Sequence, residues 1–197
     1  MNDRWSLAAL YTGFESEKFQ NDLKKLDELI AQYQKQAAEL DSAHPAAAIR
    51  GMLELDEKLT ALTSCLAIYA SLRQSANTKD AESASVSGRL MNKFASVTGA
   101  ETAFRQFVAA QENLEELIAS DPLLTEYRYL LTNIKKDSRY LLSQKEEEIM
   151  ARMSLSGADA WEELQSYLTS SVQVDFRGGK TNLSAIRNMA YDPDPAL

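Results

Sequence analysis

The amino-acid sequence predicts a mostly α-helical protein: an antiparallel bundle of long helices with one small β-hairpin near the C-terminus. Glycine and proline are scarce, at 7 and 4 of the 197 residues, which favours long uninterrupted helices over a many-turned β fold. Apolar residues recur three and four positions apart through most of the chain, the spacing of one helix face. Alternation of period two is found around Val172–Phe176 and predicts the hairpin.

A first helix is predicted from Ser16 to about Asp41. Ser16 is a suitable N-cap, and the acidic Glu17 that follows it favours a helix start. The helix should end before His44-Pro45, because residues that precede a proline avoid the helical conformation and Pro45 suits the first turn of the next helix. The apolar seam of the first helix consists of Phe19, Leu23, Leu26, Ile30, Tyr33, Ala37 and Leu40.

The second helix is predicted from Pro45 to Gln74, before the polar, turn-like segment SANTKD. Its apolar seam consists of Met52, Leu55, Leu59, Leu62, Leu66 and Tyr69. The seams of these two helices are the most regular in the chain. We therefore expect the core to include Leu26, Ile30, Leu59, Leu62 and Leu66.

A third helix is predicted from Thr78 or Asp80 to about Ile118. Gly88 and Gly99 each weaken it by roughly 1 kcal/mol relative to alanine, which favours a kink or a close helix contact near Gly99. Its apolar positions are Val86, Leu90, Phe94, Val97, Phe104, Phe107, Leu114 and either Leu117 or Ile118.

Three more helices are predicted before the hairpin. Asp121-Pro122 starts the first of them. Ser143, with Glu146 three residues later, forms a capping box that starts the second. The segment SLSG breaks that helix, and Ala158–Leu168 forms the third.

The hairpin is predicted to pivot at Gly178-Gly179, between the alternating segments VQVDF and TNL. A short helix follows over Leu183–Tyr191. Residues 192–195, DPDP, then provide cap and first-turn residues for a helix that the sequence does not contain, so we interpret the chain as a piece of a longer protein. Without the rest of that protein, this last segment should favour disorder or self-association. The apolar side chains concerned are Ile186, Met189 and Tyr191.

Charge, apolar runs and cysteine content argue against a nucleic-acid-binding, membrane-spanning or secreted protein. The net charge of −8 and the pI near 4.8 make nucleic acid an unlikely partner, because an acidic surface repels phosphate backbones. No run of about 18 apolar residues is present to span a membrane, and no secretory signal is recognisable. The single cysteine, Cys65, lies in an apolar helical stretch and is expected to be buried and inert. These features favour a cytoplasmic protein.

The residues of this sequence predict no catalytic, cofactor-binding or metal-binding site. A zinc peptidase site needs two histidines four residues apart with a glutamate between them, whereas His44 is the one histidine here. We interpret His44 as a residue of a helix junction. Glu146, Glu147 and Glu148 point in different directions on a helix and are interpreted as a solvated first turn.

Two other patterns have structural interpretations. Gly178-Gly179-Lys180 lacks the eight-residue phosphate-loop pattern and is interpreted as a hairpin turn. The aromatic side chains of Trp161, Tyr167 and Phe176 are expected to pack in the core or between domains rather than to form a binding patch.

Three segments, in this order along the chain, resemble a known family. They are WSLAALYTGFESEKFQNDL, LAIYASLRQSANTKDAES and LSQKEEEIMARMSLSGADAWEELQSYLTS, the last being the most specific. Together with the hairpin that follows, they are similar to the N-terminal region of oligoendopeptidase F, a zinc metallopeptidase of the thimet-oligopeptidase-like family.

The resemblance implies the function of a parent enzyme. That enzyme would be a zinc-dependent oligopeptidase that cleaves peptide bonds in short peptides, with its zinc motif beyond this chain. Residues 1–171 would be a helical N-terminal lobe that walls the substrate channel, and residues 172–197 would be the hairpin and the start of catalytic-region helices. The oligopeptide substrate would bind through the missing catalytic lobe, and the fragment alone would be inactive.

A second function of a different class stays open. The chain could be a stand-alone helical adaptor or oligomerisation module without enzyme activity, its exposed seams pairing with a partner.

Overall fold

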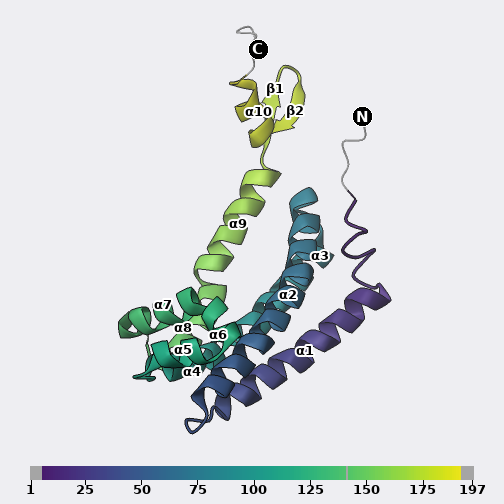
Figure 1. Ribbon diagram of the computed structural model, residues 1–197. Coiled ribbons are helices and arrows are strands. Elements are labelled where there is room, and N and C mark those ends of the chain that lie inside the picture. Colours follow the sequence, from purple (N-terminus) through teal and green to yellow (C-terminus); the bar gives the residue numbers. More distant parts are fainter. Residues whose placement is uncertain (1–5, 141, 192–197) are drawn as a thin grey trace.

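The computed structural model describes residues 6–140 and 142–191, and it confirms a mostly α-helical fold with one antiparallel hairpin near the C-terminus. Its helices are α1 (Glu17–Ala38), α2 (Pro45–Ala76), α3 (Ala81–Ala95), α4 (Thr98–Ala109), α5 (Leu114–Ser120), α6 (Pro122–Glu126), α7 (Arg128–Asp137), α8 (Gln144–Ser156), α9 (Ala158–Ser171) and α10 (Leu183–Met189), with a 3-10 turn at Ser138–Tyr140. The strands are β1 (Gln173–Phe176) and β2 (Gly179–Asn182). In Figure 1, α1, α2 and α3 lie side by side, α4 to α8 gather at one end of them, and α9 leads away to the hairpin and α10.

The first two helices form where the sequence predicts them. Ser16 caps α1, its Oγ accepting a hydrogen bond from the backbone N–H of Phe19 at 3.4 Å. The helix ends at Ala38, slightly before the predicted end. Pro45 occupies the first turn of α2, which runs two residues past the predicted Gln74. The short loop between α1 and α2 returns the chain along α1 and sets up the antiparallel packing.

An aromatic cluster closes one end of the core. Tyr11 and Phe14, which precede α1, pack edge-to-face on Phe19 and on Tyr69 of α2, with ring centroids 5.1–5.3 Å apart. The Oη of Tyr11 donates a hydrogen bond to Asp22 at 2.8 Å, and burial together with that bond raises the pKa of the tyrosine. The segment before α1 is thereby fixed to the bundle.

The core residues predicted from the two seams are buried, with one exception. Leu26, Ile30, Leu59 and Leu66 are buried, whereas Leu62 is only half-buried. Leu62 packs against the core from the edge of the buried stripe. Because a helix has 3.6 residues per turn, a seam spaced three and four drifts across the helix face and brings some of its members to the margin.

The predicted long third helix is wrong as a single element, because the structure divides that stretch into α3, α4 and α5. The first break is at Ser96-Val97, just before Gly99. There the carbonyl of Lys93 accepts from both the hydroxyl and the N–H of Ser96, at 2.6 and 3.2 Å, and the N–H of Val97 bonds to Phe94 in a tighter turn. The second break follows Ala110 and carries no glycine or proline signal. The expected apolar positions are nevertheless largely buried, because α4 and α5 fold back onto the same core.

Gly99 makes the close helix contact that its position predicts. A Cβ atom built on Gly99 would lie 2.1 Å from Oε1 of Glu148 on α8 and 3.0 Å from Nε2 of Gln144. These are ends of flexible side chains, which a larger residue would displace. The absent side chain thus allows α8 to approach α4 closely.

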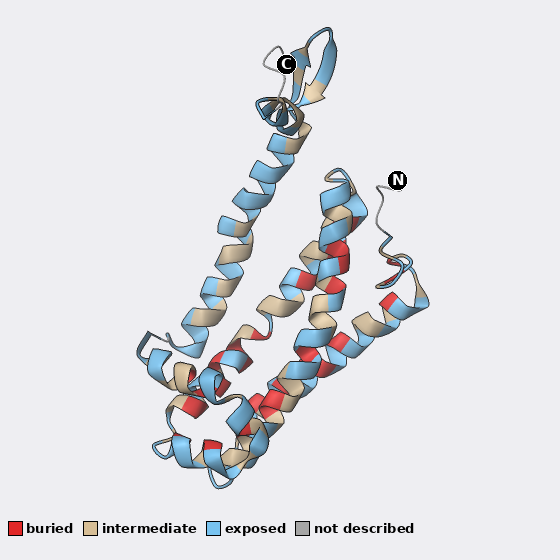
Figure 2. Cartoon of the chain, turned by 45° about the horizontal axis from the view of Figure 1, so that its top comes forward, coloured by how far each residue is buried: buried red, intermediate tan, exposed pale blue. Residues whose placement is uncertain are grey.

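We call residues 144–191, from α8 to the end of the described chain, the arm. Figure 2 shows the buried residues concentrated in α1 to α7, whereas the arm is exposed or half-buried throughout, and the last buried residue described is Ile134. Burial of Trp161 and Tyr167 in the core is therefore wrong: they are 71% and 48% exposed, while Phe176 is half-buried. α9 has no core to pack against, since it extends beyond the bundle (Figure 1).

The hairpin forms, but its turn lies one residue earlier than predicted. Phe176 pairs with Gly179, so Arg177 and Gly178 are the two central residues, with φ of 50° and 79°. Two positive φ values suit a tight turn between strands with the usual twist, and glycine accepts such a value without steric cost. Asn182 then caps α10, its side chain accepting from the N–H of Ala185 at 2.8 Å. The predicted helix start at residues 192–195 lies outside the described residues.

Candidate functional site

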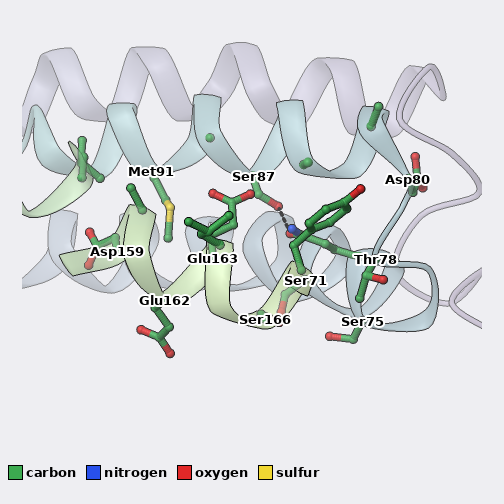
Figure 3. Close-up of a pocket in the computed structure, with 18 of the residues that line it drawn as sticks. Ser71, Ser75, Thr78, Asp80, Ser87, Met91, Asp159, Glu162, Glu163 and Ser166 are labelled. Atoms are coloured by element: carbon green, nitrogen blue, oxygen red, sulfur yellow. Dashed lines mark hydrogen bonds between the residues drawn. The ribbon is translucent and has the colours of Figure 1, made fainter. Parts of the chain in front are cut away.

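A groove of about 850 Å³ lies between α9 on one side and the α2–α3 pair on the other. Figure 3 shows Met91 from α3 and Asp159 and Glu163 from α9 pointing into the space between these helices. This groove is the candidate site.

The α2–α3 wall is held by a local hydrogen-bond network. Asp80 caps α3, and its Oδ1 accepts from the N–H groups of Glu82 and Ser83. Its Oδ2 accepts from the hydroxyl of Ser83 at 2.7 Å and pairs with Arg73 at 3.1 Å. The bonds from Ser83, and then the Arg73 charge, hold the pKa of Asp80 below its ordinary value. This carboxylate is therefore committed to fixing the turn between α2 and α3.

The α9 wall is attached at both of its ends. At its start, Gly157 separates α9 from α8, and Asp159 accepts a hydrogen bond from Ser154 at 3.2 Å. At its far end, the hydroxyl of Ser170 donates to that of Thr78 in the α2–α3 loop at 3.1 Å. Between these attachments α9 stands away from α3 and leaves the groove open.

The lining of the groove combines apolar, hydroxyl and acidic side chains. Its apolar residues include Met91, Leu155 and Leu164, and serine hydroxyls are frequent along its length. Acidic side chains outnumber Lys79, the one lysine among the lining residues, which include no arginine, histidine or cysteine. Such a lining can hold an extended chain or a cationic group.

The residues singled out in the sequence do not come together. His44 is exposed at the start of α2, with its Nδ1 2.8 Å from Asp41, as expected of a junction residue. Glu146 forms the predicted capping box with Ser143. Glu147 accepts from the N–H of Leu142 and Glu148 from the side chain of Gln144, so the three glutamates face different partners. Among the described residues, no group of three or more His, Cys, Asp or Glu side chains is arranged to hold a metal ion.

The expected burial of Cys65 is wrong, since this cysteine is exposed. It follows Ser64 on α2 and directly precedes the fully buried Leu66. Neighbouring positions on a helix differ in direction by about 100°, so an apolar stretch does not bury all its members.

The sequence analysis missed a charged cluster where α1, α2 and α4 meet. Burial raises the pKa of Asp56 on α2 and of Glu101 on α4; each also interacts with Arg105, whose charge acts in the opposite direction. The surface of Glu101 is exposed, so its carboxylate keeps some hydration. The signal was the spacing of Asp56, which lies four residues after Met52 and three before Leu59, within the apolar seam.

A neighbouring tyrosine at the junction of α6 and α7 contacts α2. The Oη of Tyr127 donates to Glu57 at 2.7 Å, and this hydrogen bond raises the pKa of Tyr127 to about 12. The charged cluster and this bond connect helices of the bundle.

Comparison with known proteins finds a family model that matches about a third of the chain. Residues 109–173, from the end of α4 to the start of β1, match the model of the N-terminal M3-peptidase family described as Oligopeptidase F. The crystal structure of oligoendopeptidase-F from Enterococcus faecium superposes with a TM-score of 0.69 over 90% of this chain, at 17% sequence identity. The resemblance to the N-terminal region of oligoendopeptidase F is confirmed.

The chain matches only part of the length of its structural relative. The chain spans 36% of the length of the Enterococcus faecium oligoendopeptidase-F chain. At 17% identity, the superposition concerns the fold. No curated protein matches the sequence. The oligopeptidase F match includes all of α8 and α9, and therefore one wall of the groove.

None of the described helices combines the length and the apolarity that crossing a bilayer requires.

Proposed function

We propose that this chain is the N-terminal, non-catalytic lobe of a zinc-dependent oligopeptidase that hydrolyses short peptides, and that it walls the substrate channel. The observation that carries the proposal is the match of residues 109–173 to the oligopeptidase F family. The superposition over 90% of the chain supports it, because the bundle and most of the arm then share one arrangement with oligoendopeptidase-F.

The zinc ion of the parent enzyme does not fit the residues of this chain. The family motif requires two histidines, and this sequence contains one, His44, which is exposed and paired with Asp41. The metal and the bond-breaking step therefore belong to another part of the parent protein.

The contribution of this chain would be to bind and orient the peptide along the groove. The serine hydroxyls can exchange hydrogen bonds with a peptide backbone, and Glu163 presents a carboxylate to the groove. An acidic wall would favour peptides with basic side chains over acidic ones. We also propose a cytoplasmic location, which the acidic composition and the single cysteine support.

A hybrid chain tests this function. In the hybrid, this sequence replaces the region of the Enterococcus faecium oligoendopeptidase-F on which it superposes. We expect the hybrid to hydrolyse a quenched octapeptide at least tenfold faster than the same enzyme lacking that region, a difference of about 1.4 kcal/mol in activation free energy. The matched control is the hybrid with Leu66→Asp, which disrupts the core and should lose the gain. Equal rates for the hybrid and the shortened enzyme would overturn the proposal.

The second candidate is a stand-alone adaptor or oligomerisation module. The exposed apolar side chains of the arm favour it, since such surfaces commonly mark protein contacts. A folded hybrid without peptidase activity, together with dimers of the isolated chain at micromolar concentration in analytical ultracentrifugation, would support this alternative.

A further inference from the structure

One face of α9 is apolar and covered by nothing in the described structure. Trp161, Leu168 and Val172, which we call the outer strip, are 71%, 51% and 41% exposed. Trp161 and Leu168 stand at positions i and i+7 and share one face of α9, and Val172 is the C-cap residue that follows the helix. Exposed tryptophan and leucine along a single helix face are unusual unless a partner covers them.

The outer strip points away from the bundle. Asp159, Glu163 and Ser166 line the groove, whereas no member of the outer strip does. At 100° per residue, Glu163 lies roughly 200° around the helix from Trp161. The carboxylates of Asp159 and Glu163 and the outer strip are therefore on different sides of α9.

α9 is poorly stabilised within this chain. It has 14 residues, none of them buried. Isolated helices of that length are marginal in water, because most helical stability in proteins comes from burying an apolar face. Its attachments here are α8 at one end and the Ser170–Thr78 hydrogen bond at the other. A surface packed on the outer strip would supply the missing burial.

The relative shows where such a surface comes from. Only a tenth of this chain lies outside the superposition on oligoendopeptidase-F, which is less than the length of the arm, so most of the arm has a counterpart there. The matched region makes up 36% of that relative, which leaves nearly two thirds of its chain available to cover the arm.

Charge argues against a second copy of this chain as the partner. Glu162 lies about 100° around the helix from Trp161 and so flanks the outer strip, whereas Asp159 and Glu163 are nearly opposite it, and α9 has no lysine or arginine. Two copies of α9 packed along each other would place like charges side by side with no compensating base. A different helix with an apolar face and basic flanks fits this helix better.

We propose that the outer strip of α9 is the docking surface for an apolar, basic-flanked helix from the part of an oligoendopeptidase-F-type chain that this sequence does not span. This inference rests on the proposed function and names the partner of the lobe. The docked helix fixes α9, and with it one wall of the groove.

Hydrogen exchange measured by mass spectrometry tests the docking. The amides of α9 are compared in the isolated chain and in the hybrid, with the amides of α1 and α2 reporting that the bundle is folded in both. We expect α9 to exchange at least tenfold more slowly in the hybrid. The double substitution Trp161→Lys/Leu168→Lys should abolish that gain. The control is Ile68→Lys, at a residue of α2 that is 51% exposed, which should keep it.

A second measurement uses the isolated chain alone. If the outer strip faces solvent there, Trp161→Lys changes the melting temperature by less than about 1 °C, since surface substitutions cost little. A loss as large as that of Leu66→Ala would mean that Trp161 is part of the core and would overturn the proposal.

The outcomes separate docking from function. Equal α9 exchange in the hybrid and the isolated chain, with α1 and α2 protected in both, would overturn the docking. Protection of α9 that rises with the concentration of the isolated chain would overturn it in favour of a second copy. Protected α9 in a hybrid without peptidase activity would keep the docking and overturn the proposed function. Peptidase activity in a hybrid whose α9 is not protected would keep the proposed function and overturn the docking.

Discussion

At the scale of single residues, burial rather than spacing decides what a side chain contributes. Leu62 and Leu66 belong to the same predicted seam, yet Leu66 is fully buried and Leu62 is half-buried. Their roles in stability should differ accordingly, since the cost of removing a side chain depends on the contacts and the cavity that it leaves.

We expect Leu66→Ala to lower the free energy of unfolding by about 2–5 kcal/mol, the range for a buried leucine. Leu62→Ala is the matched comparison and should cost clearly less, because part of its surface already faces water. Urea denaturation monitored by circular dichroism gives both values. Equal costs for the two leucines would contradict the assignment of Leu62 to the edge of the core.

A second residue-scale prediction concerns pH. Burial raises the pKa of Asp56 above its ordinary value of 3.8, so the folded state holds the proton more tightly than the unfolded state does. The stabilisation from this proton is complete below the unfolded pKa and is lost as the pH rises through the folded pKa. We therefore expect the free energy of unfolding of Asp56→Asn, relative to that of the native sequence, to increase from pH 4 to pH 7.

Asp80 provides a control of opposite sign. Its pKa is lowered, so its stabilisation is present at neutral pH and is lost as the pH falls through the folded pKa. The free energy of unfolding of Asp80→Asn, relative to that of the native sequence, should decrease from pH 4 to pH 7. Unfolding free energies measured at both pH values test the pair, and a shift of the same sign for both substitutions would refute the electrostatic account.

At the scale of elements, the sequence predicts the helices that begin with strong signals. Ser16, Pro45, Asp121-Pro122 and the Ser143–Glu146 box all start helices in the structure. The division of residues 81–120 into three helices was not predictable from local signals, because the break after Ala110 contains no glycine or proline and depends on how α4 and α5 fold onto the core.

The hairpin shows how far turn chemistry alone can predict a position. The two glycines at 178 and 179 indicated the pivot, but the strand register places Arg177 and Gly178 at the centre. Two-residue turns are fixed by pairing on both sides, and an arginine with positive φ gives no sequence signal.

The two glycines can be distinguished by substitution. Gly178→Ala should destabilise the hairpin by about 1 kcal/mol, since a φ of 79° is unfavourable for a residue with a Cβ. Gly179→Ala is the control: its φ is outside that region, and its added Cβ makes an ordinary contact with Phe176 at 3.9 Å. Amide exchange of β1 and β2 reports the local stability. A larger effect at Gly179 would place the turn where the sequence predicted it.

At the scale of the whole molecule, the bundle and the arm differ in how much apolar surface they bury. α1 to α7 bury a shared core, whereas the arm exposes apolar side chains and forms one wall of the groove (Figure 2). The sequence indicated the family and the absence of a catalytic motif, but not the groove, because α9 and α3 are distant in sequence and meet only in the fold. The acidic side chains of the groove also predict a preference among peptide substrates, which can be tested.

We expect Glu163→Lys in the hybrid to raise the KM for peptides with lysine or arginine several-fold and to lower it for acidic peptides, with kcat nearly unchanged. Glu126→Lys, at an exposed residue of α6 that does not line the groove, is the control. Steady-state kinetics on matched peptides measure the effect. An equal change in KM for basic and acidic peptides would show that the groove does not face the substrate.

The central claim is that this chain is a lobe of a peptidase whose chemistry resides elsewhere. The most direct measurement is made on the isolated, dialysed chain, by metal analysis and by mass spectrometry of short peptides after long incubation. The account predicts no stoichiometric zinc and intact peptides, because the one histidine cannot form the required pair. One zinc ion per chain, held by ligands within these residues and accompanied by peptide cleavage, would contradict it.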